Sequence, residues 1–178
     1  MSNSDNIPIL YKIGKALNKK YQFNQYRQNF TFDFDINGSD SDQVIRNFLC
    51  SNLNISTEKA SEAVIIHKTI NEDGLKWHID DCQIVTRKEP PIYDVEKFIQ
   101  IDEKKYLFFK TPSSKLPYRT ILFYSSTYGI DFEGGILRLV DKEIFPSKGN
   151  GIMFDSREAH MVTPVKSGIR KITLVKLY

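Results

Sequence analysis

The stretch GIMFDSREAHMVTPVKSGIRKITLVKL, residues 151–177, decides the fold of this 178-residue chain. It contains three short apolar runs, Gly151–Phe154, His160–Val165 and Ile169–Leu177, and polar or Gly-containing segments separate them. Short runs rich in β-branched residues, bounded by turn residues and without helical periodicity, are typical of β-strands. The end of the chain therefore predicts a set of short, mostly antiparallel strands.

The same pattern extends back to about residue 62. Many short strands closed by Gly, Asn, Asp and Pro turns are typical of a β-sandwich or jelly roll. We therefore predict a mainly β fold with flanking helices (α+β), whose β-core spans residues 61–178. The further candidate strands are residues 63–68, 75–85, 98–101, 106–110, 119–124 and 135–140.

Residues 1–60 are predicted to form a cover of helices and a strand within the same domain. Apolar residues recur at helical spacing over residues 9–21, and apolar and polar residues alternate over residues 30–36. Ser41 is a candidate cap for a second helix, which carries an apolar face over residues 44–53. These helices are expected to pack on the β-core.

Composition excludes several classes of protein. The net charge is only +3 and no basic block occurs, so we expect no nucleic-acid partner. No apolar run is long enough to span a membrane, and the first residues are polar and acidic, unlike a signal peptide. We expect no membrane partner and take the cytoplasm as the default location. The oligomeric state is left open.

His78-Ile79-Asp80 is the first candidate metal-binding motif. In a strand, residues two apart point to the same face, so the imidazole and the carboxylate can converge on one ion, whereas Asp81 points away. The alternative is a hydrogen-bonded pair without a metal. The other histidine in this part of the chain, His67, is predicted to be structural.

His160, far along the chain, is the candidate third ligand. Two imidazoles and one carboxylate form the facial triad of non-haem Fe(II) oxygenases, which leaves positions open for O2 and a second substrate. Two alternatives remain: His160 packs independently of the other two residues, or the three residues bind zinc.

Arg170 is a candidate anchor for a carboxylate. Lys166–Gly168 is expected to turn the chain, so that Arg170 lies on the strand beside the one that bears His160. A guanidinium about two strand residues from the metal, roughly 7 Å, can bind the far carboxylate of a five-carbon 2-oxo diacid. The alternative is a surface arginine on a terminal strand.

The chain resembles the 2-oxoglutarate- and Fe(II)-dependent dioxygenase superfamily in the order of three motifs. They are His78-x-Asp80, Gly134-Gly135-x-Leu137 and His160-x-Val-x-Pro-Val-x-x-Gly168-x-Arg170. It looks most like the prolyl 4-hydroxylase branch, and the resemblance covers about residues 61–178. The segment from His160 to Arg170 is the most specific part.

The resemblance implies a double-stranded β-helix, which is a cupin-like form of jelly roll. It implies that His78, Asp80 and His160 hold Fe(II), that Arg170 and Tyr124 contact 2-oxoglutarate as co-substrate, and that ascorbate is a further cofactor. The implied reaction hydroxylates a C–H bond, such as one in a prolyl residue of a protein or peptide, with release of succinate and CO2.

The chain departs from the prolyl 4-hydroxylase branch in two places. Relatives often carry a tyrosine nine or ten residues before the first histidine ligand, where this chain has His67-Lys68-Thr69. Residues 87–117 form a longer insertion than expected, with a predicted hairpin around residues 102–104. Loops of this kind often select substrate. A small-molecule or other side-chain substrate, and a non-catalytic metal-binding jelly-roll module, therefore remain as alternatives.

Overall fold

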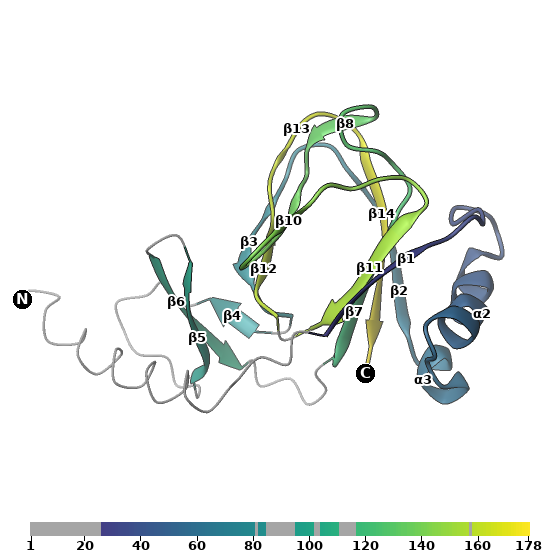
Figure 1. Cartoon of the computed structure of the whole chain (residues 1–178), viewed down its shortest axis with the longest axis horizontal. Coiled ribbons are helices and arrows are strands. Elements are labelled where there is room, and N and C mark those ends of the chain that lie inside the picture. Colours follow the sequence, from purple (N-terminus) through teal and green to yellow (C-terminus); the bar gives the residue numbers. More distant parts are fainter. Residues whose placement is uncertain (1–25, 81, 85–94, 102–103, 111–116, 157) are drawn as a thin grey trace, which may run out of the picture.

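The larger of two antiparallel sheets forms one wall of the β-core (Figure 1). The computed structural model describes residues 26–80, 82–84, 95–101, 104–110, 117–156 and 158–178, so the predicted helix over residues 9–21 lies outside the described residues. In spatial order, the strands of the larger sheet are β1 (Arg27–Thr31), β11 (Asn150–Asp155), β7 (Arg119–Tyr124), β14 (Arg170–Leu177) and β2 (Val64–Ile70).

The smaller sheet forms the opposite wall. Consecutive core strands alternate between the two sheets: β2, β7, β11 and β14 belong to the larger one, and β3, β9 and β12 to the smaller one. This alternation is the strand order of a jelly roll. The predicted mainly β class with antiparallel sheets is confirmed. The strands of the smaller sheet are β10 (Glu143–Ile144), β9 (Leu137–Leu139), β12 (His160–Val162) and β3 (Leu75–His78).

Apolar side chains from both sheets meet in the interior. Along β7, Leu122 and Tyr124 point inward, because residues two apart share a face of a strand. They pack in one buried cluster with residues of the smaller sheet such as Leu137 and Val162. The interior between the sheets is therefore lined with aliphatic side chains except where polar residues interrupt them.

The outer face of the larger sheet is covered by α2 (Ser41–Asn52) and α3 (Thr57–Ser61). Ile45 and Leu49 of α2 are fully buried in a cluster with Phe123, which points outward from β7. The predicted second helix is confirmed. Its N-cap residue is Asp40, which makes no side-chain capping hydrogen bond, so the prediction that Ser41 caps the helix is wrong.

Three predicted strands differ from the structure. The one predicted over His160–Val165 is divided between β12 (His160–Val162) and β13 (Val165–Gly168), so the predicted turn at Lys166–Gly168 is wrong. The strand predicted over residues 75–85 is split into β3 and β4 (Cys82–Ile84). The strand predicted over residues 30–36 runs instead as β1, which ends at Thr31, and the rings of Phe32 and Phe34 beyond its end pack around Phe123 as that of Phe30 does.

The predicted hairpin around residues 102–104 is confirmed by the antiparallel pairing of β5 (Val95–Ile101) with β6 (Lys104–Lys110). These two strands and β4 form a third sheet in the order β4-β6-β5. A short pair, β13 (Val165–Gly168) with β8 (Phe132–Gly134), connects the smaller sheet to β14. Within the described residues, no helix has the length and apolar character needed to cross a membrane.

Phe123→Ala should lower the free energy of unfolding by about 3 to 5 kcal/mol, the usual cost of truncating a buried aromatic side chain. Phe123 is fully buried, and its ring lies 5.0 Å from that of Phe30 and 5.8 Å from that of Phe48 between centroids. Urea denaturation followed by circular dichroism measures the change. Phe145→Ala, at a ring that is 51% exposed, is the control and should change stability by less than about 0.5 kcal/mol.

Candidate metal centre

Three side chains of the predicted ligand set come together at one end of the interior. His78 is the last residue of β3 and His160 the first residue of β12, and the two face each other in the antiparallel register. Asp80 follows two residues after His78. The structure brings one potential ligand atom from each of the three residues to within 4.8 Å of the others. A single ion can therefore contact all three.

Asp80 reaches this position in a different way from the one predicted. Strand β3 ends at His78, and Asp80 lies in the following turn, where its backbone N–H donates to the carbonyl of Ser156 at 3.0 Å. The strand-parity argument was therefore wrong for Asp80, since a turn and a long-range hydrogen bond orient the carboxylate. Asp81 lies outside the described residues.

Both histidine rings are held by the same local hydrogen bond. Nδ1 of His78 lies 2.7 Å from the carbonyl oxygen of Lys76, and Nδ1 of His160 lies 2.8 Å from that of Glu158. A carbonyl oxygen can only accept, so Nδ1 carries the proton in each ring. The lone pair of Nε2 is then free in both rings, and neutral imidazole with a free nitrogen is the form that binds a metal.

The carboxylate of Asp80 has two neighbours that the sequence analysis did not identify. The hydroxyl of Thr120 donates to Oδ2, and Nζ of Lys176 lies 3.5 Å from Oδ1. Burial opposes ionisation, but His160, Lys176 and Thr120 together lower the pKa of Asp80. Thr120 and Lys176 are polar residues at inward-facing positions of β7 and β14. In the sequence, a polar residue at an otherwise apolar inward position was the feature that could have identified each of them.

Arg170 lies at the start of β14 and is only 1% exposed. Within the described part of the chain, its Nε and Nη2 have no hydrogen-bond partner. Burial lowers the pKa of this guanidinium. A buried cation with unpaired donors is costly, so its position favours an anionic ligand.

The predicted position of Arg170 on the strand beside His160 was wrong. Its strand, β14, belongs to the larger sheet, and His160 belongs to the smaller one. Before Arg170 the chain passes through β13 and then through Gly168, whose φ of +76° suits glycine and lets the chain cross between the sheets. Arg170 therefore faces the interior from the opposite wall.

A glycine gives the side chain of Arg170 its space. A Cβ atom at Gly135 would lie 2.7 Å from Cδ of Arg170, and Gly135 has a φ of +59°. A larger residue at Gly135 would push the arginine stem aside as well as strain the backbone. Gly135, the second glycine of the Gly134-Gly135 pair, is thus part of the arginine site.

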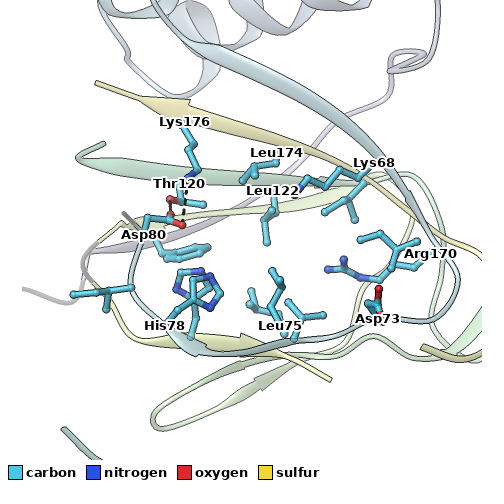
Figure 2. Close-up of a pocket in the computed structure, with 17 residues that line it drawn as sticks. Lys68, Asp73, Leu75, His78, Asp80, Thr120, Leu122, Arg170, Leu174 and Lys176 are labelled. Carbon is cyan, nitrogen blue, oxygen red and sulfur yellow. Dashed lines mark hydrogen bonds and ion pairs between the residues drawn. The ribbon is translucent and has the colours of Figure 1, made fainter. Parts of the chain in front are cut away.

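One cavity of about 290 Å³ connects the two groups. Figure 2 shows His78 and Asp80 at one end and Arg170 at the other, with aliphatic side chains such as Leu75 and Leu122 between them. Lys68, Asp73 and Lys176 also line the cavity. Its size suits a small ligand, and its two ends offer a cation site and an anion site.

Tyr124 and His67 lie outside this cavity. Tyr124 is buried with no hydrogen-bond partner for Oη among the described residues, and burial raises its pKa to about 12. Cζ of Arg170 lies 6.0 Å from the centroid of its ring. His67 instead bonds Thr173 at 2.8 Å and Asp42 at 3.0 Å on the other face of β2, in line with the structural role predicted for it.

The donor set fits a divalent metal. Two neutral imidazole nitrogens and one carboxylate supply three ligands and leave further coordination positions open. Fe(II) in oxygenases and catalytic zinc both accept such a set, whereas a structural zinc site closes all four positions with protein ligands.

No protein-family model and no curated protein sequence matches this chain. Among solved structures, it is similar to the viral collagen prolyl hydroxylase of Paramecium Bursaria Chlorella virus-1 in its 2OG complex, with 16% identity over 99% of this chain and 89% of that chain and a TM-score of 0.45. It is also similar to an oxidoreductase of the 2OG-Fe(II) oxygenase family from Burkholderia pseudomallei, with 10% identity over 97% of this chain and 77% of that chain and a TM-score of 0.43.

The metal-free protein should lose stability as the pH falls from 6.5 towards 4. Burial lowers the pKa of His160 to about 4, whereas an unfolded histidine has a value near 6.5. Between these values the unfolded state binds more protons, so the free energy of unfolding should fall by about 1.4 kcal/mol per pH unit. Urea denaturation in chelator at pH 7, 6 and 5 measures the slope.

In His160→Gln the part of this slope that comes from His160 should vanish. An equal slope in the two proteins would assign the acid sensitivity to another group.

Proposed function

We propose that this chain is an Fe(II)- and 2-oxoglutarate-dependent dioxygenase that hydroxylates a C–H bond with release of succinate and CO2. The observation that carries the proposal is the buried guanidinium of Arg170, which has unpaired donors in the same cavity as His78, Asp80 and His160. A three-ligand centre and a carboxylate anchor at the two ends of one small cavity match a 2-oxo diacid.

The arginine distinguishes this proposal from a non-catalytic metal-binding module. A structural metal needs neither an open coordination position nor a buried cation across the cavity. Arg170 is costly to the folded protein while its donors are unpaired, and a dianionic co-substrate offsets that cost on binding. A metal-binding module that does not bind 2-oxoglutarate would not explain why a buried guanidinium with unpaired donors lies in this cavity.

Each residue has a proposed role. His78, Asp80 and His160 hold Fe(II), which supplies O2 activation coupled to oxidative decarboxylation of the co-substrate when bound. Arg170 binds the distal carboxylate of 2-oxoglutarate, and Tyr124 is proposed to assist it. The aliphatic walls around Leu122 exclude water from the space between them. Ascorbate is proposed as the reductant that keeps the iron in the Fe(II) state.

The proposed substrate is a prolyl residue of a protein or peptide, and this choice rests on the sequence motifs from His78 to Arg170. A small molecule or another side chain is the second candidate, favoured by the long insertion over residues 87–117, which departs from the prolyl 4-hydroxylase pattern.

Purified protein with Fe(II), ascorbate and 2-oxoglutarate should release succinate, and the correct substrate should stimulate that release. A panel of proline-containing peptides and small metabolites identifies the substrate by the increase in succinate. His160→Ala removes one metal ligand and should reduce the rate to background. Succinate formation that is equal in the two proteins, or absent from the wild type across the panel, would contradict the proposal.

Arg170→Ala should weaken 2-oxoglutarate binding by roughly 10- to 150-fold, because charge-assisted hydrogen bonds contribute about 1.5 to 3 kcal/mol. Calorimetric titration of 2-oxoglutarate into the Mn(II)-loaded protein measures the affinity without turnover. Lys171→Ala, at the next position on β14 where the side chain is exposed, is the matched control and should bind like the wild type. Unchanged affinity in a folded Arg170→Ala protein would exclude Arg170 as the anchor.

A further inference from the structure

A buried ion pair connects Arg27 to Glu158, two residues before the proposed ligand His160. Arg27, the first residue of β1, donates from Nε to both carboxylate oxygens of Glu158, at 2.9 and 3.0 Å, and its Nη2 also donates to Glu158. The outer edge of the same guanidinium binds Asp141 through Nη1 at 3.0 Å and Nη2 at 2.6 Å. One arginine thus holds two carboxylates from separate parts of the chain.

The inner half of this arrangement is buried. The side chain of Glu158 is 3% exposed and that of Arg27 is 13% exposed, whereas Asp141 is 51% exposed. A buried carboxylate is strongly unfavourable unless a cation pairs with it, so Glu158 depends on Arg27 for its position. Asp141 is largely in water and contributes much less.

The turn that carries Glu158 contacts two of the proposed metal ligands. The carbonyl of Glu158 accepts the hydrogen bond from Nδ1 of His160 at 2.8 Å. Two residues earlier, the carbonyl of Ser156 accepts the backbone N–H of Asp80 at 3.0 Å. The backbone of one turn thus accepts hydrogen bonds from the ring of His160 and from the backbone N–H of Asp80, and the Arg27–Glu158 pair attaches that turn to the edge strand β1.

We propose that Arg27 and Glu158 are positioning residues of the metal centre: their ion pair fixes the backbone of the turn that orients His160, and so sets the affinity for a divalent metal. This inference deepens the proposed function and rests on its metal site. Groups that hold a histidine ligand by its second nitrogen are known to change metal affinity by 10- to 100-fold, and here that group is a backbone carbonyl whose own position depends on a side chain.

Co(II) alone is the probe, because its binding is seen in the visible absorption spectrum and needs no 2-oxoglutarate and no turnover. Arg27→Gln should raise the Kd for Co(II) by about tenfold or more and change the shape of the spectrum. Arg27→Lys, which restores a cation opposite Glu158, should recover at least part of the loss. Asp141→Asn, at the exposed carboxylate, should have little effect.

Arg119→Gln is the matched control. Arg119 also pairs with a carboxylate next to that turn, Asp155, the last residue of β11, at 3.3 Å, but both side chains are partly exposed and Asp155 does not hold the ring of His160. Its Kd for Co(II) should stay within about twofold of the wild-type value. A merely structural role for Arg27 predicts a lower melting temperature with unchanged Kd and spectrum, and that result would overturn the proposal.

The ring of His160 gives a second readout in the metal-free protein. Its ¹⁵N chemical shifts should report a single tautomer protonated at Nδ1 in the wild type and a mixture of tautomers in Arg27→Gln. Fixed Nδ1 protonation in both proteins would also overturn the proposal. If the wild type binds no Co(II), the metal centre itself fails, and the ¹⁵N shifts still decide whether Arg27 orients the ring.

Discussion

The antiparallel pairing of β12 with β3 is the constraint on which the rest of the site depends, because it sets His160 directly opposite His78. In such a pairing, a slip of one residue turns a side chain to the other face of the sheet. The register is held from both sides, since β12 also pairs with β9, where His160 lies opposite Leu139. The β12–β3 register shifts between His160 and Val162, so the position of His160 opposite His78 is set at that one pair and at the pair of His160 with Leu139.

The cavity between the two sheets contains a carboxylate, Asp80, at one end and a guanidinium, Arg170, at the other. Aliphatic side chains separate these two charged groups. Leu122 and Leu174 occupy inward positions on adjacent strands between Asp80 and Arg170, so neither charged group can neutralise the other directly. Asp80 is compensated locally by Thr120 and Lys176. Among the described residues, Nε and Nη2 of Arg170 have no hydrogen-bond partner, although Asp73 lies at the same end of the cavity, and this end is the proposed site for an anion.

Sequence reasoning identified the residues whose chemical type is informative, His78, Asp80, His160 and Arg170, and the structure brings all four to one cavity. It could not predict which sheet carries Arg170, because the crossing at Gly168 depends on the pairing of β13 with β8. It also missed the groups that act through long-range contacts. Arg27 and Glu158 are 131 residues apart, and no local pattern connects an arginine on an edge strand to a glutamate in a distant turn.

Both histidines of the candidate site donate Nδ1–H to the carbonyl two residues earlier, so the backbone rather than another side chain orients their rings. For His78 that backbone belongs to β3, whose pairing with β12 shifts register between His78 and Leu75. For His160 it belongs to a turn, which has no ladder and is held by separate contacts. A buried ion pair is weak evidence for stability in general, and we propose that at this turn it holds the backbone that orients His160. The two proposed ligands are thus oriented by different parts of the backbone, one in a strand and the other in a turn.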